Sequence, residues 1–421
     1  MKVFKFGGAS IKDADAVRNV KTIISEYSDK RNLLVVVSAM GKSTNGLEAI
    51  LEAYHKGDDY KPLIEEMRNF HLDISRELFN NQEATIFKQL DQLFFLLEKK
   101  LTSGIEDKDE LYDQIVSFGE LISSHIISAY LNQEDVPTQF IDARIYIQTS
   151  ETWREGQVDY DWTEQMIKAE LPAILDKQVI LTQGFIGGTI SNRTTTLGRE
   201  GSDFSAAIFA HCLDADGLTI WKDVPGIMNA DPKRVPDATL YDKLSYKYAA
   251  EMTYYGASVI HPKTIRPLAV KGIPLYVKSF VHPSDPGTVI GDVEMKDNTK
   301  TAYIFKKNQC LMRFEEKDFL NVNKAHLGVV FNELSRYNIK LNLTRNSALS
   351  FTICVDYNES NIQRVINVLS DHFYISTLNH LELITVRNYT DEAIKGLGID
   401  PATILIEQRT DDNYQVVKKA D

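Results

Sequence analysis

The sequence predicts an α/β protein with a largely parallel sheet, followed by a smaller α+β unit of ferredoxin-like order. Strand-like segments, polar loops and helical segments alternate through the first two thirds of the chain, a pattern that forms parallel sheets with functional loops at the strand ends. The run Leu33–Val37 is apolar throughout, as in strands buried on both faces. Beyond about residue 301 the order of elements is roughly βαββαβ.

The chain opens with an alternating strand, Lys2–Phe6, which leads into the glycine loop Gly7-Gly8-Ala9-Ser10 and then a helical pattern. The next strand, Leu33–Val37, is followed by a loop that contains Gly41-Lys42-Ser43. This tripeptide looks like the end of a P-loop, but Val36 stands where the first glycine of that motif should be. We therefore give the P-loop interpretation little weight.

A helical insertion is expected from about residue 47 to 131, where apolar residues recur at helical spacing among charged ones, as in Leu90–Leu101. It ends at Ser117-Phe-Gly-Glu120, where Glu120 is either a helix cap or a ligand-binding carboxylate, and the cap is favoured when this segment is taken alone. Strand-like segments then return at Thr138–Ile141, Val179–Thr182 and Leu218–Trp221.

A segment rich in Pro, Gly and Asp, from Pro283-Ser-Asp-Pro-Gly287 to about Thr301, predicts a domain boundary. We expect an α/β domain over residues 1–290, a βαββαβ domain over 301–380 and a short or truncated second unit over 381–421. The strands and helices expected after the boundary are Cys310–Phe314, Phe319–Val322, His326–Tyr337, Lys340–Thr344, Leu349–Val355, Ile362–Phe373, Leu381–Val386, Thr403–Gln408 and Tyr414–Val417.

Composition narrows the function classes. The 421 residues include 47 Lys and Arg against 59 Asp and Glu, and the net charge of −12 argues against a general nucleic-acid binder. The three cysteines, Cys212, Cys310 and Cys354, have neither a disulfide pattern nor zinc-ligand spacing. Because the N-terminus lacks an apolar signal core and no apolar run approaches membrane-spanning length, we expect a cytoplasmic protein without membrane partners.

The stretch Leu197–Ala207 has the composition of an active-site loop. Gly198 and Gly201 allow close approach of a ligand or positive φ, and Arg199 can form a bidentate contact with a carboxylate or phosphate. Ser202 or Asp203 can cap a helix expected from about Asp203 to Leu213, whose N-terminus would face an anion. Taken alone, the stretch is better interpreted as a capped surface turn.

Together with the other loops, this stretch resembles one family. Seven motifs occur in the order and spacing of aspartate kinases (aspartokinases) of the amino-acid-kinase family. They are Lys5-Phe-Gly-Gly-Ala-Ser10, Ser38-Ala39 with Thr44-Asn45, Phe118-Gly-Glu120, Gln183-Gly-Phe-Ile-Gly187, Thr195–Ala207, Asp223-Val-Pro-Gly-Ile227 with Asp231-Pro232, and Gly256-Ala-Ser-Val-Ile-His-Pro262. The resemblance implies an amino-acid-kinase fold to about residue 290 and a C-terminal region similar to ACT regulatory domains.

The activity that the resemblance implies is transfer of the ATP γ-phosphoryl group, with Mg²⁺, to the side-chain carboxylate of L-aspartate. The product, 4-phospho-L-aspartate, starts the biosynthesis of lysine, threonine and methionine. Lys5 would stabilise charge on the transferring group, and Asp203 would orient Lys5. The implied substrate-binding residues are Ser38, Thr44, Glu120, Phe185, Arg199 and Ser202. The implied nucleotide-binding residues are Gly7, Gly8, Ser10, Lys222, Asp223, Met228 and Lys233.

The chain departs from the family at three positions. Ala9 stands where threonine is usual, Glu200 where glycine is frequent, and Ser258 where a lysine of the nucleotide site is common. We expect the Glu200 side chain to point to solvent. The lost lysine at Ser258 implies weaker ATP affinity.

The ACT resemblance implies a homodimer formed through this region and an amino-acid effector such as lysine or threonine. Because the part after Leu381 is short, we expect the first ACT unit to act mainly as an interface, with weak or no lysine inhibition. Two alternatives stay open. One is a kinase of another small carboxylate, such as glutamate or N-acetylglutamate. The other is a catalytically weak regulatory protein that binds an amino acid.

Overall fold

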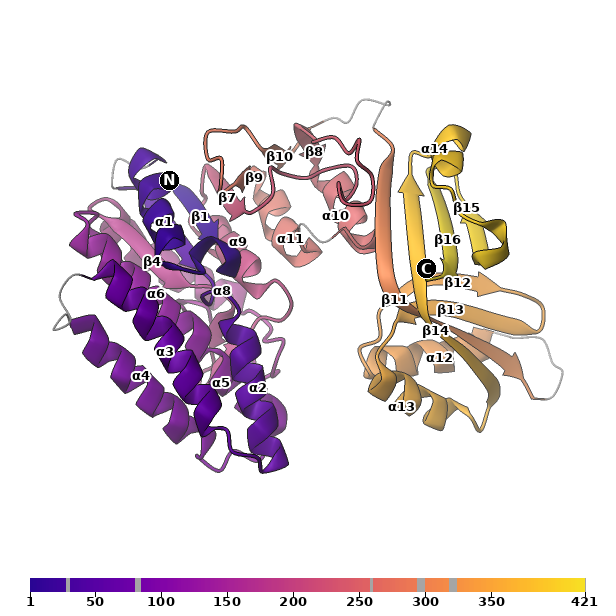
Figure 1. Ribbon diagram of the computed structural model, residues 1–421, viewed down its shortest axis with the longest axis horizontal. Helices are drawn as coiled ribbons and strands as arrows, with labels where there is room; N and C mark the ends of the chain where they lie inside the picture. The colour runs from indigo at the N-terminus through magenta and orange to yellow at the C-terminus, as the bar shows by residue number, and fades with distance from the viewer. Residues whose placement is uncertain (28–30, 80–84, 258–259, 294–299, 318–323, 421) are drawn as a thin grey trace. The chain divides into compact units, whose positions relative to one another are not determined.

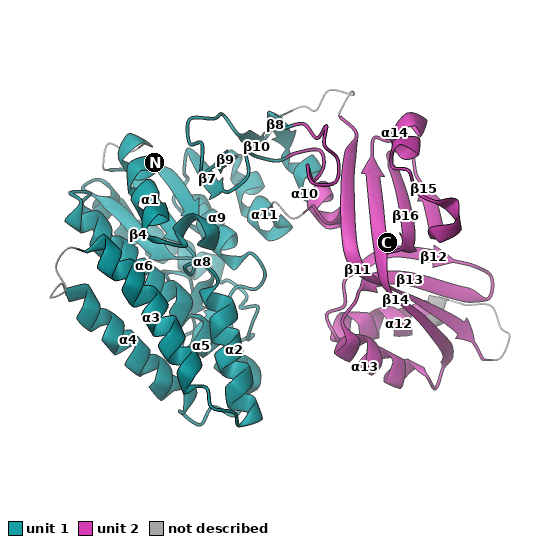
Figure 2. Ribbon diagram, in the orientation of Figure 1, with its two compact units in different colours: residues 1–227, 240–250, 258–294 teal, residues 228–239, 251–257, 295–421 magenta. Residues whose placement is uncertain are grey.

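The protein is represented by a computed structural model that describes residues 1–27, 31–79, 85–257, 260–293, 300–317 and 324–420. Its chain forms two compact units (Figure 2). Unit 1 contains residues 1–227, 240–250 and 258–294, and unit 2 contains residues 228–239, 251–257 and 295–421. Two short segments that precede the predicted boundary near residue 290 therefore belong to unit 2.

Unit 1 is built on a central sheet. Among the described residues, eight strands form it in the order β3-β4-β2-β1-β7-β9-β10-β8, and all neighbours are parallel except β9 and β10 (Figure 1). The strands are β1 (Lys2–Phe6), β2 (Leu33–Val37), β3 (Thr138–Ile141), β4 (Val179–Gln183), β7 (Gly217–Lys222), β8 (Lys243–Ser245), β9 (Leu275–Ser279) and β10 (Thr288–Gly291).

The predicted boundary segment Pro283–Thr301 is partly wrong, because β10 lies inside it and pairs with both β9 and β8. Pro283, Pro286 and Gly287 lie in the turn before β10, whereas Gly291 is the last residue of that strand. Local composition marks a turn but does not indicate whether the chain then returns to the sheet it has just left.

Helices cover the sheet, and a hairpin of β5 (Ile186–Gly188) and β6 (Thr194–Thr196) lies beside it. The helical elements of this part of the chain are η1 (Gly8–Ile11), α1 (Ala14–Tyr27), α2 (Ser43–Lys56), α3 (Lys61–Leu78), α4 (Thr85–Leu101), α5 (Lys108–Val116), α6 (Phe118–Gln133), α7 (Ala143–Tyr146), α8 (Tyr160–Leu175), α9 (Gly201–Cys212), α10 (Tyr246–Tyr255) and α11 (Pro262–Lys271). The expected helical insertion corresponds to α2–α6.

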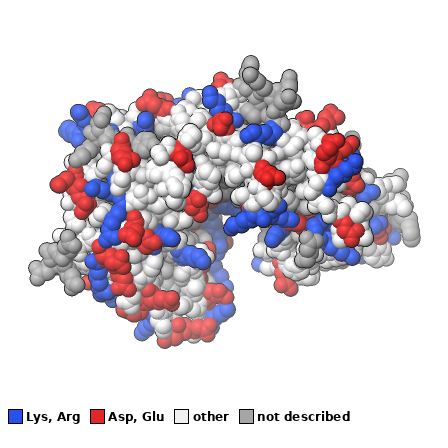
Figure 3. Space-filling model, turned by 45° about the horizontal axis from the view of Figure 1, so that its top comes forward, with Lys and Arg blue, Asp and Glu red and all other residues white. Residues whose placement is uncertain are grey.

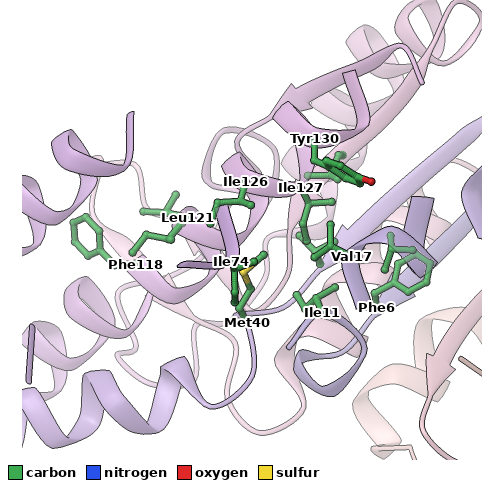
Figure 4. Packing of buried hydrophobic residues seen from close by; sticks show 14 of the residues in the cluster. Phe6, Ile11, Val17, Met40, Ile74, Phe118, Leu121, Ile126, Ile127 and Tyr130 are labelled. Atoms are coloured by element: carbon green, nitrogen blue, oxygen red, sulfur yellow. The ribbon is translucent and has the colours of Figure 1, made fainter. Parts of the chain in front are cut away.

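The two faces of β1 have different roles, because one packs in the apolar core and the other carries a lysine. Phe4 and Phe6 point to the face where one buried apolar cluster joins the sheet to α1–α6; Figure 4 shows Phe6 with other members of this cluster. Lys5 points to the opposite face, where α9 packs. A lysine in a strand that is otherwise buried needs a counterion there, since an unpaired buried charge is costly.

The described residues of unit 2 form one antiparallel sheet in the order β12-β13-β11-β14-β16-β15. Its elements are β11 (Ala302–Glu316), α12 (Lys324–Arg336), β12 (Leu341–Asn346), β13 (Ser350–Asp356), α13 (Glu359–Leu369), β14 (Phe373–Arg387), α14 (Asp391–Gly396), η2 (Pro401–Thr403), β15 (Ile404–Arg409) and β16 (Asn413–Lys419). From β11 to β14 the order is βαββαβ, as predicted. The expected strand Phe319–Val322 lies outside the described residues.

The strands β11 and β14 are each 15 residues long and run through both parts of this sheet. One half of β11 pairs with β13, and the last part of β14 pairs with β16. The two expected C-terminal units, 301–380 and 381–421, therefore share these two strands. Apolar side chains of α12 and α13 share one buried cluster with the sheet, which includes Leu334, Val365 and Phe314. The turn-rich stretch near Gly396 contains the short helix α14.

The surface carries both signs of charge. Figure 3 shows acidic and basic side chains interspersed over the face it presents. Within the described parts of the chain, no helix combines the length and the apolar character needed to cross a membrane.

Candidate active site

A cavity of about 500 Å³ lies in unit 1 where the loops that follow β1, β2 and β4 meet the start of α9 and the end of β7. Loops at the carboxyl ends of parallel strands gather at one edge of a sheet, which is the usual place for a ligand. The residues that line it are Lys5, Gly8, Ser38, Ala39, Gly41, Thr44, Tyr112, Glu120, Arg154, Phe185, Thr196, Gly198, Arg199, Glu200, Gly201, Ser202, Asp203 and Lys222.

A buried ion cluster lies at one side of this cavity. The Nζ atom of Lys5 is 2.6 Å from Oδ1 of Asp203, and Nζ of Lys222 is 3.4 Å from Oδ2 of the same carboxylate. Burial alone would raise the pKa of Asp203, but the charges of Lys5 and Lys222 hold it below its ordinary value. The cluster has two cations for one anion, so it presents net positive charge to a bound ligand.

The helix α9 begins at Gly201, two residues earlier than predicted. Its N-cap is Glu200, without a side-chain capping bond, and both Ser202 and Asp203 lie in the first turn. The predicted capping role of Ser202 or Asp203 is therefore wrong. The carboxylate of Asp203 is instead committed to the two lysines, and the helix N-terminus adds its own positive potential to this side of the cavity.

Glu200 contradicts the expectation that it points to solvent. Its backbone is left-handed, with φ 55° and ψ 29°, a conformation that glycine adopts more easily. This turn directs the side chain into the cavity, where Oε2 is buried and has no hydrogen-bond partner among the described residues. Burial raises the pKa of Glu200, while Lys222 opposes the shift.

Glu120 lies on the first turn of α6 but does not cap it, so the capping alternative is wrong. Its Oε1 accepts a hydrogen bond of 3.2 Å from the backbone N–H of Ala39, and its Oε2 is buried without a partner among the described residues. The residue is 3% exposed, and burial raises its pKa to about 8, although Ala39 and Lys5 act in the opposite direction. A cationic ligand group would satisfy this oxygen.

The other expected substrate-binding residues also line the cavity. Arg199 is exposed at its rim. Phe185 has φ 69°, and its N–H donates to Ser205 Oγ at 2.9 Å, which holds the turn after β4. The expected substrate-binding residues that line the cavity are Ser38, Thr44, Glu120, Phe185, Arg199 and Ser202.

The loop after β1 requires glycine at position 8 because it packs tightly against the loop after β2. A Cβ atom at this position would lie 2.8 Å from the carbonyl oxygens of both Ala39 and Gly41, so only glycine fits between the two loops. Gly7 does not line the cavity, although a Cβ there would lie 3.3 Å from Lys5 Nζ.

The expected nucleotide-binding residues are only partly gathered here. Gly8 and Lys222 line the cavity, whereas Ser10 is buried and donates to the Trp221 carbonyl at 3.4 Å. Asp223 is exposed and is not part of the lining. Met228 and Lys233 belong to the segment 228–239 of unit 2, and Ser258 lies outside the described residues.

Eight lining residues were not among the expected site residues: the small residues Ala39, Gly41, Gly198 and Gly201, and the larger residues Tyr112, Arg154, Thr196 and Glu200. The guanidinium of Arg154 lies 3.9 Å from the centre of the Tyr112 ring, and its Nε pairs with Asp109. Arg154 lies in a loop without a recognisable motif, so the neighbouring sequence did not indicate that it would line a ligand site. Thr196 and Glu200 belong to the motif Thr195–Ala207, but the sequence does not show whether their side chains point into the cavity.

Comparisons with known proteins agree with this geometry. The model of the amino acid kinase family matches residues 1–279. The lysine-sensitive aspartokinase 3 of Escherichia coli K12 is 33% identical over 356 residues, which cover 84% of this chain and 78% of that protein. The chloroplastic aspartokinase 1 of Arabidopsis thaliana is 31% identical over 408 residues, with coverages of 92% and 68%.

The fold of the whole chain is shared with a solved structure. The crystal structure of E. coli aspartokinase III in complex with aspartate and ADP aligns over 100% of this chain and 96% of that chain, with a TM-score of 0.88 and 28% sequence identity. The family match, the relatives and this structural similarity agree with one another. The chain therefore belongs to the amino acid kinase family and, within it, to the aspartate kinases.

Proposed function

We propose that this protein transfers the γ-phosphoryl group of ATP to the side-chain carboxylate of L-aspartate and forms 4-phospho-L-aspartate. One observation carries the proposal: a single cavity holds the cluster of Lys5, Asp203 and Lys222 together with the unpaired Oε2 of Glu120 and the guanidinium of Arg199. These groups suit a ligand with two carboxylates and one ammonium beside a polyphosphate. The aspartate and ADP bound in the related E. coli enzyme support it.

The nucleophile in this reaction needs no general base, because a carboxylate is already ionised at neutral pH. The protein must instead bring two anions into line and offset their repulsion. Lys5 and Lys222 supply the positive charge, and Asp203 keeps both ammonium groups at the cavity wall. Asp203 is therefore assigned an orienting role.

Substrate recognition follows the charges of aspartate. We assign the α-carboxylate to Arg199, whose planar guanidinium can form two parallel hydrogen bonds. We assign the ammonium to Oε2 of Glu120, whose other oxygen is already bonded to Ala39. The side-chain carboxylate would then face the lysine cluster. Ser38, Thr44, Phe185 and Ser202 complete the wall around the substrate.

The residues present fit Mg²⁺ carried by the nucleotide. No group of three or more His, Cys, Asp or Glu side chains suited to a metal occurs in the described part of the chain. Mg²⁺ keeps several waters and needs only one or two protein carboxylates beside substrate phosphates, and Oε2 of Glu200 is the available donor in this cavity. When bound, the ion would neutralise charge on the phosphates.

Regulation and assembly are proposed by extension. We propose a homodimer formed through residues 301–380, with residues 381–421 as a short second ACT-like unit and with weak or no inhibition by lysine. A related E. coli structure contains lysine together with aspartate, so lysine is the first effector to test. Strong inhibition by millimolar lysine or threonine would contradict the proposal.

The deciding experiment is trapping of the acyl phosphate as its hydroxamate, with ATP, Mg²⁺ and either aspartate, glutamate or N-acetylglutamate. Each reaction is run with and without lysine, and Lys5→Met is the matched control for contaminating kinases. Product with aspartate alone would support the proposal. Product with another carboxylate would change the substrate, and aspartate binding without product would indicate the regulatory alternative.

A further inference from the structure

One face of α5 is attached to strand β6. Glu110, Asp113 and Gln114 are three and four residues apart, so their side chains lie on the same side of the helix. Oε2 of Glu110 accepts from Nη1 of Arg193 at 3.0 Å, and Nε2 of Gln114 donates to the Thr194 carbonyl at 2.7 Å. The helical insertion thus supplies hydrogen-bond partners to β6.

Asp113 is the buried member of this face. Its side chain accepts three hydrogen bonds: Oδ2 from the backbone N–H groups of Arg154 at 2.9 Å and Thr196 at 3.0 Å, and Oδ1 from Oγ1 of Thr196 at 2.7 Å. The residue is fully buried. These donors lie 41 and 83 residues away in the chain, so the carboxylate joins three separate segments.

The two bonded segments both reach the cavity. Arg154 and Thr196 line it, and Thr196 is three residues before Arg199. The segments also contact one another, because Gly156 N–H donates to the Thr196 carbonyl at 2.8 Å and a Cβ at Gly198 would lie 3.4 Å from the Arg154 carbonyl oxygen. Loss of Asp113 would leave two backbone N–H groups of this wall, those of Arg154 and Thr196, without their acceptor.

The charge of Asp113 strengthens these bonds. Burial raises the pKa of Asp113 to about 6, although the bonds from Thr196 and the Arg154 backbone, together with the Arg154 charge, lower it. The carboxylate is therefore the main form at neutral pH. Hydrogen bonds to an ionised acceptor are roughly twice as strong as neutral ones.

We propose that Asp113 is a positioning residue for aspartate binding, which holds the Arg154 segment and the Thr196–Arg199 segment so that their side chains face the substrate. This inference rests on the proposed aspartate kinase function. Because Asp113 acts on the substrate side of the cavity and not on the lysine cluster, its loss should weaken aspartate binding while leaving phosphoryl transfer from bound substrates largely intact.

The test compares Asp113→Ala with Asp113→Asn and measures KM for aspartate, KM for ATP and kcat. Asp113→Ala should raise KM for aspartate about tenfold or more, with kcat and KM for ATP changed less than about threefold. Asp113→Asn should recover part of this loss, since its amide oxygen can accept both N–H groups while its NH₂ donates to the Thr196 hydroxyl. Glu110→Gln, which weakens only the pair with Arg193, is the control and should leave KM unchanged.

A second pair of variants covers the case in which Asp113→Ala does not fold. Thr196→Val removes the hydroxyl donor and should raise KM for aspartate, whereas Thr196→Ser keeps the donor and should not. The proposal would be overturned if KM for aspartate were unchanged in every folded variant. It would also be overturned if Asp113→Ala lowered kcat about tenfold without raising KM for aspartate. Calorimetric titration with aspartate alone separates the two proposals, because wild-type protein that binds aspartate without turnover contradicts only the kinase function.

Discussion

Aspartate binding is expected to release a proton from Glu120. The carboxyl group is buried, its pKa is raised by burial to about 8, and its Oε2 has no hydrogen-bond partner among the described residues. At pH 7 a group with this pKa is roughly 90% protonated in the free protein. An ammonium placed against Oε2 favours the carboxylate, so binding at pH 7 should release about 0.9 proton.

The same linkage sets the pH dependence of affinity. Between about pH 6 and pH 7, the dissociation constant for aspartate should fall roughly tenfold, or about 1.4 kcal/mol, because less free energy is needed to remove the proton. Between pH 7 and pH 8 it should fall only about fivefold, since the free carboxyl group is then partly ionised. Aspartate itself has no group that titrates in this range. Calorimetric titrations at pH 7 in buffers of different ionisation enthalpy count the released protons, and Glu120→Gln should release none and bind aspartate weakly.

The raised pKa of Glu120 should also make the free energy of unfolding depend on pH. The folded-state pKa of Glu120 lies above its ordinary value of 4.5, so the neutral side chain stabilises the free protein below about pH 4.5. This contribution is lost as pH rises through about 8, and bound aspartate compensates for the loss. The thermal shift caused by aspartate should therefore grow with pH. No proton release at pH 7, together with wild-type affinity in Glu120→Gln, would refute the reasoning.

Three further predictions concern other buried groups. Asp203→Asn leaves Lys5 and Lys222 beside a neutral amide, so kcat for hydroxamate formation should fall on the order of 10²-fold, and a change below threefold would contradict the orienting role. Glu200→Gly relieves the left-handed φ of 55°, so it should stabilise the fold by about 1 kcal/mol in urea unfolding, and it removes the proposed Mg²⁺ donor, so it should raise KM for ATP; an unchanged or lowered KM would contradict the Mg²⁺ contact. His71 has a pKa lowered to about 4 by burial, so wild-type stability should fall relative to His71→Gln by about 1.4 kcal/mol per pH unit from pH 6.5 towards 4, and parallel stability curves for the two proteins would contradict this.

Local sequence pattern predicted much of the fold. The apolar run Leu33–Val37 forms the buried strand β2, and the alternating segment Lys2–Phe6 forms β1 with Lys5 on the face opposite the phenylalanines. The helical spacing after residue 47 predicted the layer α2–α6. These features are recoverable because backbone periodicity and burial of apolar side chains act over short stretches of chain.

The loops that carry the reactive side chains could be identified from the sequence alone. Lys5, Glu120, Arg199 and Asp203 stand beside strand ends and helix starts, positions that parallel topology brings to one edge of a sheet. Resemblance to a family supplied their proposed roles.

Which polar groups lack a hydrogen-bond partner, and which are bonded to distant parts of the chain, depends on the tertiary structure. Glu200 enters the cavity because of one left-handed residue, and Asp113 meets Thr196 from 83 residues away. The strand β10 returns to the first sheet after a turn that looked like a boundary. Side-chain direction, burial and the pairing of distant hydrogen-bond groups depend on how whole elements pack, and no short stretch of sequence contains that information.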